Sequence, residues 1–138
     1  MALNPSGYSG TPLAKKLGIK AGTRVLPLEA PAEYREWLGD LPDDVTFVKT
    51  LTPDVAIVHV FAMRAAKLRL HLERLRKSIA PATAIWVSWP KKASKVPTDI
   101  TEDVIRDIAL PLGLVDVKVC AVTDVWSGLR LVIRKSER

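Results

Sequence analysis

Cysteine is almost absent from this sequence of 138 residues, in which Cys120 stands alone. One cysteine forms no intramolecular disulfide and cannot build a zinc site by itself. Long apolar runs are missing as well. The longest, residues 55–63, is interrupted by His59 and is far shorter than the ~20 residues that span a bilayer. The first residues lack the apolar segment of a signal peptide. We therefore expect a cytoplasmic protein without membrane contact.

Motifs that announce catalysis are also missing. The sequence has no Gly-x-Ser-x-Gly turn, no Walker loop, no His-Glu-x-x-His and no paired carboxylates with evident acid/base geometry. His59 lies within an apolar run and is interpreted as a hydrogen-bonded core residue. His71 lies on a basic helix face, where we expect it to be solvated. The sequence therefore predicts no catalytic residue, no metal site and no cofactor.

The charge is positive and unevenly spread. The net charge is +6, with 48% hydrophobic and 26% charged residues, an ordinary composition for a globular protein. Residues 29–54 are mainly acidic, whereas residues 64–95 are strongly basic. Such asymmetry favours an anionic partner. The length fits one domain, which we place at residues 11–138 behind an extended arm at residues 1–10.

Hydrophobic periodicity predicts alternating strands and helices. Residues 54–61 form a continuous apolar run, which is typical of a strand buried in a parallel sheet. Residues 64–79 show an apolar stripe at helical spacing, and Asp99 with Glu102 has capping-box spacing for a helix that ends at Gly113. The other predicted strands are residues 24–28, 45–48 and 83–88, and the other predicted helices are residues 11–18 and 31–38.

The end of the chain is different, because residues 115–121 and 129–133 alternate between apolar and other side chains around a tight loop with Ser127 and Gly128. This pattern predicts an antiparallel hairpin. The fold class is α/β: a small Rossmann-like, methyltransferase-like, mostly parallel sheet with helices on both faces and a C-terminal antiparallel hairpin. Residues 50–53 are too short for a crossover. The strand at 45–48 therefore pairs antiparallel or returns across the sheet as extended chain. Pro27 predicts an edge or an irregularity in the first strand.

The turn after the first strand contains no glycine. It holds Glu29, Pro31 and Glu33, at the place where S-adenosylmethionine needs glycine because its amino-acid end packs against bare backbone. The acid that usually holds the ribose at the end of the second strand is replaced by Lys49. Both departures argue against an ordinary cofactor site on this fold.

Two later loops carry candidate ligand groups. Trp89 is followed by Lys91, Lys92 and Lys95, so this loop either holds a phosphate or carboxylate beside an indole, or is solvated with Trp89 folded onto the core. Trp126, in the loop between the last two strands, is interpreted as covering the sheet edge, the alternative being that it stacks on a ligand.

Several strings of the sequence resemble a bacterial domain-of-unknown-function family, number three-zero-five-two. They are Gly7 to Gly18, Trp89 to Ser94, Thr98 to Asp103, Leu112 to Cys120 and Trp126 to Leu131. The resemblance implies a small bacterial intracellular protein and supports the fold prediction, but it brings no established activity.

These strings predict one cationic and aromatic site at one end of the sheet. Its candidate residues are Tyr8, Lys15, Lys16, Trp89, Lys91, Lys92, Ser94, Asp124, Trp126 and Ser127. The same strings could instead cap the core and hold the arm down. Our leading hypothesis is a non-catalytic binding module for an anionic small molecule or an acidic protein surface. The alternatives are a non-standard S-adenosylmethionine-dependent methyltransferase and a nucleic-acid-binding accessory protein, which the basic helix would serve without a recognised reader motif.

Overall fold

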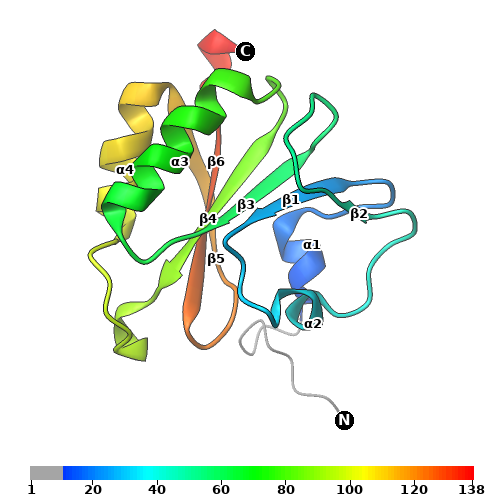
Figure 1. Ribbon diagram of the computed structural model, residues 1–138, viewed down its shortest axis with the longest axis horizontal. Helices are drawn as coiled ribbons and strands as arrows, with labels where there is room; N and C mark the ends of the chain where they lie inside the picture. Colours follow the sequence, from blue (N-terminus) through cyan, green and yellow to red (C-terminus); the bar gives the residue numbers. More distant parts are fainter. Residues whose placement is uncertain (1–10) are drawn as a thin grey trace.

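A mixed six-stranded sheet with strand order β2-β1-β3-β4-β6-β5 forms the centre of the computed structural model (Figure 1), which describes residues 11–138. The predicted N-terminal arm lies outside the described residues. The strands are β1 (Arg24–Leu28), β2 (Thr46–Phe47), β3 (Ile57–Phe61), β4 (Ala84–Pro90), β5 (Leu114–Ala121) and β6 (Trp126–Ile133). The α-helices are α1 (Leu13–Leu17), α2 (Tyr34–Leu38), α3 (Ala65–Ser78) and α4 (Glu102–Ala109). Short 3-10 turns are η1 (Lys92–Ser94), η2 (Leu110–Leu112) and η3 (Lys135–Glu137).

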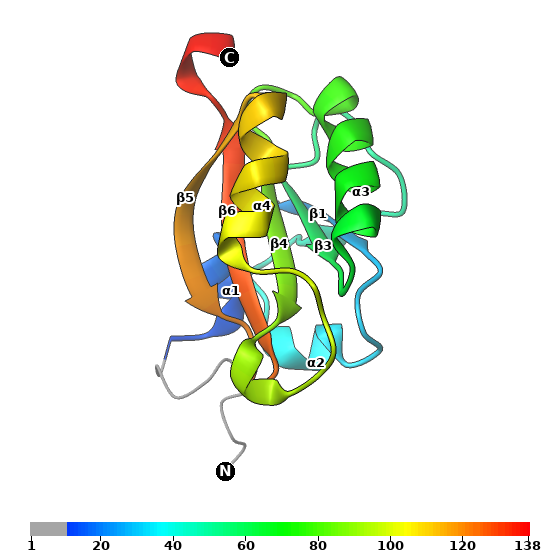
Figure 2. The same ribbon diagram turned by 90° about the vertical axis from the view of Figure 1, so that its left-hand side faces the viewer.

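Helices cover both faces of this sheet, as the sequence predicts (Figure 2). Under α3 and α4 lies one core, to which α3 contributes its fully buried Leu68 and Leu72. Each such leucine stabilises the fold by roughly 1.5–3 kcal/mol through burial. Under α1 and α2 lies the second core. There the Trp86 indole N–H of β4 donates to the carbonyl of Leu17 at 3.0 Å and ties α1 to the sheet.

The four strands β2, β1, β3 and β4 are parallel, and β6 pairs antiparallel with both β4 and β5. The parallel core and the final hairpin therefore confirm the sequence prediction. The loop of the hairpin does not, because Ser127 and Gly128 lie inside β6. Gly128 serves close packing rather than a turn. A Cβ atom there would lie 3.1 Å from Val122 Cγ2 and 3.3 Å from Trp86 Cε3.

The strand at residues 46–47 pairs parallel with β1, so the antiparallel alternative was wrong. The extended return exists, but it is formed by the residues after β2 and not by the strand itself. After β2 the chain crosses the sheet without a helix. Val48 and Leu51 pack against the core beneath α3, and Val55 is buried in that core. A return this short suffices because β2 has only two residues.

Pro27 lies where β1 has an open side. The amide of Val48 donates to the Val25 carbonyl at 2.8 Å on the β2 side. Alternation along the strand directs the nitrogen of Pro27 to the same side, and the last β1 residue paired with β2 is Val25. The missing N–H therefore leaves no ladder partner unsatisfied, and the prediction of a local edge at Pro27 is confirmed.

Asp99 caps a different helix from the one predicted. Its Oδ1 atom accepts from the amide of Ala65 at 2.7 Å and so caps the start of α3, far away in the sequence. The N-cap of α4 is Thr101, whose hydroxyl accepts from the amide of Val104 at 3.2 Å. Spacing alone could not reveal this exchange, because the loop after β4 folds back against the loop after β3.

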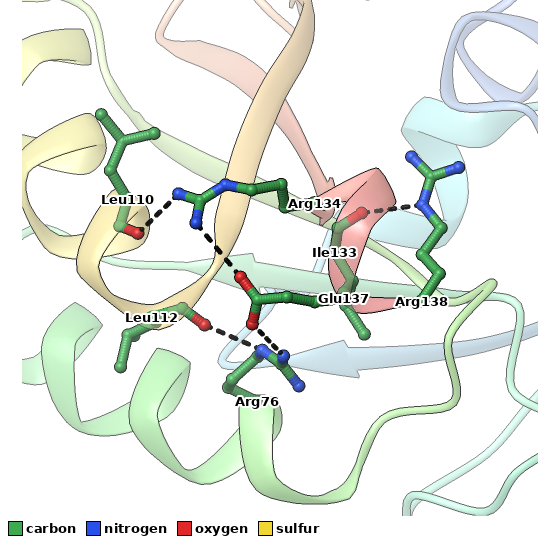
Figure 3. Close-up of polar contacts among 7 residues, drawn as sticks. All are labelled: Arg76, Leu110, Leu112, Ile133, Arg134, Glu137 and Arg138. Atoms are coloured by element: carbon green, nitrogen blue, oxygen red, sulfur yellow. Dashed lines mark hydrogen bonds and ion pairs between the residues drawn. The ribbon is translucent and has the colours of Figure 1, made fainter.

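The C-terminus lies at the opposite end of the sheet from the loop after β4 (Figure 1), and polar contacts fix it there (Figure 3). The Glu137 carboxylate receives a hydrogen bond from Arg76 at 3.0 Å and another from Arg134 at 3.1 Å. Arg76 also donates to the Leu112 carbonyl at 2.8 Å. The Glu137 carboxylate therefore joins α3 to the end of β6, and Arg76 links both to η2.

Candidate functional site

A crevice opens at the carboxyl ends of the neighbouring strands β1 and β3. After β1 the chain forms β2 on one side of that strand, and it then forms β3 on the other side. Open α/β sheets bind ligands at such a point. The crevice measures about 440 Å³, which lies within the range of small-molecule sites. Its walls include Glu29, Phe61, Met63, Arg64, Lys67 and Trp126.

Glu29 stands in this crevice in a left-handed backbone conformation, with φ of 59°. Its Oε2 atom lies 2.8 Å from His71 Nε2 and 3.5 Å from Lys67 Nζ, both on α3. The hydrogen bond with His71 is the main cause that lowers the pKa of Glu29, and Lys67 adds to it against the effect of burial. The turn after β1 is therefore clamped to α3 by a carboxylate instead of offering bare backbone.

Glu29 carries a conformational cost that glycine would not. A non-glycine residue in the left-handed region costs roughly 1–2 kcal/mol. Glu29→Gly and Glu29→Ala both lose the contacts with His71 and Lys67, so the two variants differ mainly in this conformational cost. We expect Glu29→Gly to be more stable than Glu29→Ala by about 1 kcal/mol in urea unfolding. Equal stability of the two variants would show that the turn holds no such strain.

A chain of three buried polar side chains lies beside the crevice. His59 of β3 is fully buried, and its Nδ1 and Nε2 atoms lie 2.9 Å from the Tyr34 hydroxyl and 2.8 Å from the Ser88 hydroxyl. Burial lowers the pKa of His59 to about 3 and raises that of Tyr34, against the charge of Arg35. Either neutral tautomer satisfies both hydroxyls, because each hydroxyl can donate or accept. The interpretation of His59 as a hydrogen-bonded core residue is confirmed.

Aromatic rings connect this buried chain to the crevice. The His59 ring stacks on Phe61 at a centroid distance of 4.4 Å, and Phe61 meets Trp126 edge-to-face at 5.1 Å. Trp126 thus forms a wall of the crevice. The prediction that it covers the sheet edge was wrong, because β6 lies between β4 and β5.

The loop after β4 forms a second, smaller pocket of about 400 Å³. Its lysines are Lys92 and Lys95, and Trp89 and Ile100 form its apolar part. Trp89 is only 6% exposed and belongs to the core beneath α3 and α4. Of the two alternatives predicted for this residue, the one in which it folds onto the core is therefore confirmed. Lys92 and Lys95 are exposed, so the pocket is cationic at its rim.

The two tryptophan segments do meet, as predicted, but they do not form one site. Ser127 pairs with Trp89, and the amide of Lys91 donates to the Val125 carbonyl at 2.8 Å. The indoles nevertheless belong to different cores and line different pockets. This separation follows from the pairing register, since Trp126 faces Pro90 on the neighbouring strand rather than Trp89.

Other predicted site residues have structural contacts or point to solvent. The Ser94 hydroxyl donates to the Lys91 carbonyl at 2.7 Å within the η1 turn. The ammonium of Lys16 donates to the Ala121 carbonyl at 3.4 Å, while Lys15 and Asp124 are exposed. Tyr8 lies outside the described residues.

Sequence reasoning missed the residues that hold the crevice. His71 is not a solvated side chain, since its ring is 17% exposed and contacts Glu29. Met63 and Arg64 come two and three residues after the end of β3 at Phe61. The carboxyl end of a buried parallel strand was the signal that could have identified them.

The part of the chain that the structure describes contains no helix long and apolar enough to cross a membrane. Within residues 11–138 no group of three histidine, cysteine or acidic side chains could hold a metal ion. Cys120 is half-buried, and burial raises its pKa against the opposing charges of Lys16 and Lys118.

No family model and no curated protein matches the chain. Solved structures do match. A SAM-dependent methyltransferase from Aquifex aeolicus is 17% identical with a TM-score of 0.60, over 88% of this chain and 87% of that one. A putative type 11 methyltransferase from Sulfolobus solfataricus is 13% identical with a TM-score of 0.62, over 91% and 92%. Fibrillarin from Aeropyrum pernix, with natively bound S-adenosyl-L-methionine, is 11% identical with a TM-score of 0.55, over 92% and 71%. At these identities the likeness concerns the fold: the chain has a Rossmann-like, methyltransferase-like fold.

Proposed function

We propose that this chain is a non-catalytic binding module for a small anionic molecule, which it holds in the crevice at the carboxyl ends of β1 and β3. One observation carries the proposal. Arg64 lines the crevice and has no ion-pair or side-chain hydrogen-bond partner among residues 11–138. The neighbouring cation, Lys67, is shared with Glu29. The crevice therefore keeps one uncompensated positive charge at its mouth.

The groups around the crevice support binding rather than catalysis. A general base must come within hydrogen-bond reach of the proton that it removes. Glu29 is held by His71 and Lys67, and its pKa is lowered, which weakens it as a base. His59 is fully buried behind Phe61. Glu29 and His59 therefore make structural contacts and are poorly placed to act as a general base.

Isothermal titration with inorganic phosphate and with small aliphatic and aromatic carboxylates tests the proposal. We expect the wild type to bind at least one of them and Arg64→Ala to weaken that binding by about tenfold, the loss expected for one charge-assisted contact. Arg69→Ala is the matched control, because Arg69 is an exposed arginine of α3, the helix that Arg64 precedes, and does not line the crevice. Equal losses of affinity in Arg64→Ala and Arg69→Ala would mean that binding depends on the net charge of the protein and not on a contact with Arg64, and would contradict the proposal.

The pocket beside Trp89 is the other place where an anion could bind, as the sequence analysis proposes. A Lys92→Ala/Lys95→Ala double variant in the same titration separates the two locations. Loss of binding in this variant, with Arg64→Ala unaffected, would move the site to the loop after β4 and contradict the location proposed here.

A second candidate function is methyl transfer, which the fold favours, since the solved neighbours include a protein with bound S-adenosyl-L-methionine. A ligand that binds only the native state raises the melting temperature. Thermal-shift measurement with S-adenosylhomocysteine therefore discriminates. A shift at sub-millimolar ligand in the wild type would favour the enzyme and contradict the non-catalytic proposal. Nucleic-acid binding stays a prediction of the basic charge, and elution from heparin at low salt would count against it.

A further inference from the structure

From the walls of the crevice we infer that its anionic ligand carries a planar aromatic ring, which lies against Trp126 while the anionic group meets Arg64. This inference rests on the proposed function and names the class of ligand. It depends on two features of the crevice: an aromatic wall held in place before any ligand binds, and an unpaired cation that lines the same crevice.

The aromatic wall is fixed by its neighbours. The Trp126 carbonyl accepts from the amides of Val122 and Thr123 at 2.9 and 3.1 Å, and its own amide donates to the Thr123 hydroxyl at 3.1 Å. The indole meets Phe61 edge-to-face, and Phe61 is only 2% exposed. Trp126 itself is only partly buried and lines the crevice. A rigid indole offers stacking area at a low entropic cost.

Met63 forms an adaptable part of the same crevice. Its side chain is 48% exposed, whereas its carbonyl accepts from the Thr98 hydroxyl at 2.7 Å. The backbone is thus held while the thioether remains free to move. A flexible thioether makes favourable contacts with aromatic rings. A rigid indole and a mobile thioether together suit a flat ring better than a branched aliphatic group.

The charges decide which aromatic ligands fit. Asp99 lies near the start of α3, where its carboxylate accepts from the Ala65 amide, and among residues 11–138 it forms no ion pair with Arg64. Glu29 is shared by His71 and Lys67, so Arg64 remains as the available charge. A sulfonium such as that of S-adenosylmethionine, if placed beside this guanidinium, would be repelled by it, because like charges at short range repel. An aromatic carboxylate or phosphate would instead be attracted at one end and stacked at the other.

Isothermal titration with three matched probes tests the inference. They are naphthalene-2-carboxylate, the neutral 2-naphthylmethanol and the saturated decahydronaphthalene-2-carboxylate. We expect the wild type to bind naphthalene-2-carboxylate about tenfold more tightly than either analogue, since the alcohol lacks the charge-assisted contact and the saturated ring lacks the aromatic stacking, each worth about that much. Arg64→Ala should abolish the preference for charge, and Trp126→Leu the preference for the ring, whereas Arg69→Ala should keep both.

The outcomes separate the inference from the proposed function. Equal binding of the aromatic and saturated carboxylates, unchanged in Trp126→Leu, would overturn the inference and leave an anion-binding module. Absence of binding by every carboxylate and by phosphate would overturn both. Trp126→Phe keeps a ring on β6 and guards against misfolding of the leucine variant. It should retain part of the preference for naphthalene-2-carboxylate, and complete loss in a folded Trp126→Phe protein would also contradict stacking on this wall.

Discussion

His59→Ala is expected to lower the free energy of unfolding by about 3–5 kcal/mol, one of the two largest effects that we predict. Two losses add up in this variant. Removal of the imidazole leaves a cavity in the core beneath α1 and α2. It also leaves the hydroxyls of Tyr34 and Ser88, which His59 bonds at 2.9 and 2.8 Å, buried without that partner. Urea unfolding followed by far-UV circular dichroism measures the change.

His71→Ala is the matched control, because it removes the same side chain from a position near the surface. Its contact with Glu29 has a half-exposed carboxylate on one side, and exposed ion pairs contribute about 0–1 kcal/mol. We expect a loss within that range. Similar losses for the two variants would mean that the buried hydrogen bonds of His59 do not stabilise the fold as their geometry implies.

The position of His59 explains why so polar a residue is kept in a parallel strand. Its ring stacks on Phe61, which in turn meets Trp126 edge-to-face. Its nitrogens join α2 to β4 through Tyr34 and Ser88. Hydrogen bonds at both nitrogens fix the orientation of the imidazole ring, whereas an aliphatic side chain at this position would make no directional contacts. The buried chain therefore supports the aromatic wall of the crevice.

The sequence predicts the architecture well because hydrophobic periodicity is a local property. The apolar run that contains β3, the stripe along α3 and the alternation around β6 each follow from neighbouring residues. The pairing of β2 was left open, since the choice depended on how Val48 and Leu51 pack beneath α3. The exchange of caps between Asp99 and Thr101 depends on a contact between two loops, which no spacing encodes.

The candidate site was predicted less well, for a similar reason. The glycine-free turn was visible in the sequence, but the clamp between Glu29 and His71 joins residues far apart in the chain. Trp89 and Trp126 were assigned to one site because their loops meet at one end of the sheet. Side chains alternate between faces along a strand, and the register β4–β6 directs these two indoles into different pockets.

The second large effect concerns acid. Folding lowers the pKa of His59 from 6.5 to about 3 because burial disfavours the imidazolium. Below pH 6.5 the unfolded chain therefore binds a proton at this residue that the native state does not bind. Stability is unaffected by His59 well above pH 6.5, declines as the pH falls below 6.5, and stops declining near pH 3. The steepest loss is about 1.4 kcal/mol per pH unit.

Comparison with His59→Gln isolates this loss, because glutamine can bond both hydroxyls and does not titrate. Between pH 6.5 and 4.5 the wild type should lose about 2 kcal/mol more stability than the variant. The carboxyl groups with lowered pKa, Glu29 and Asp54, ordinarily titrate at 4.5 and 3.8, and they cancel in the difference. Parallel stability curves for the two proteins over this interval would show that His59 takes up its proton in the native state, so that the Tyr34–His59–Ser88 chain opens without unfolding.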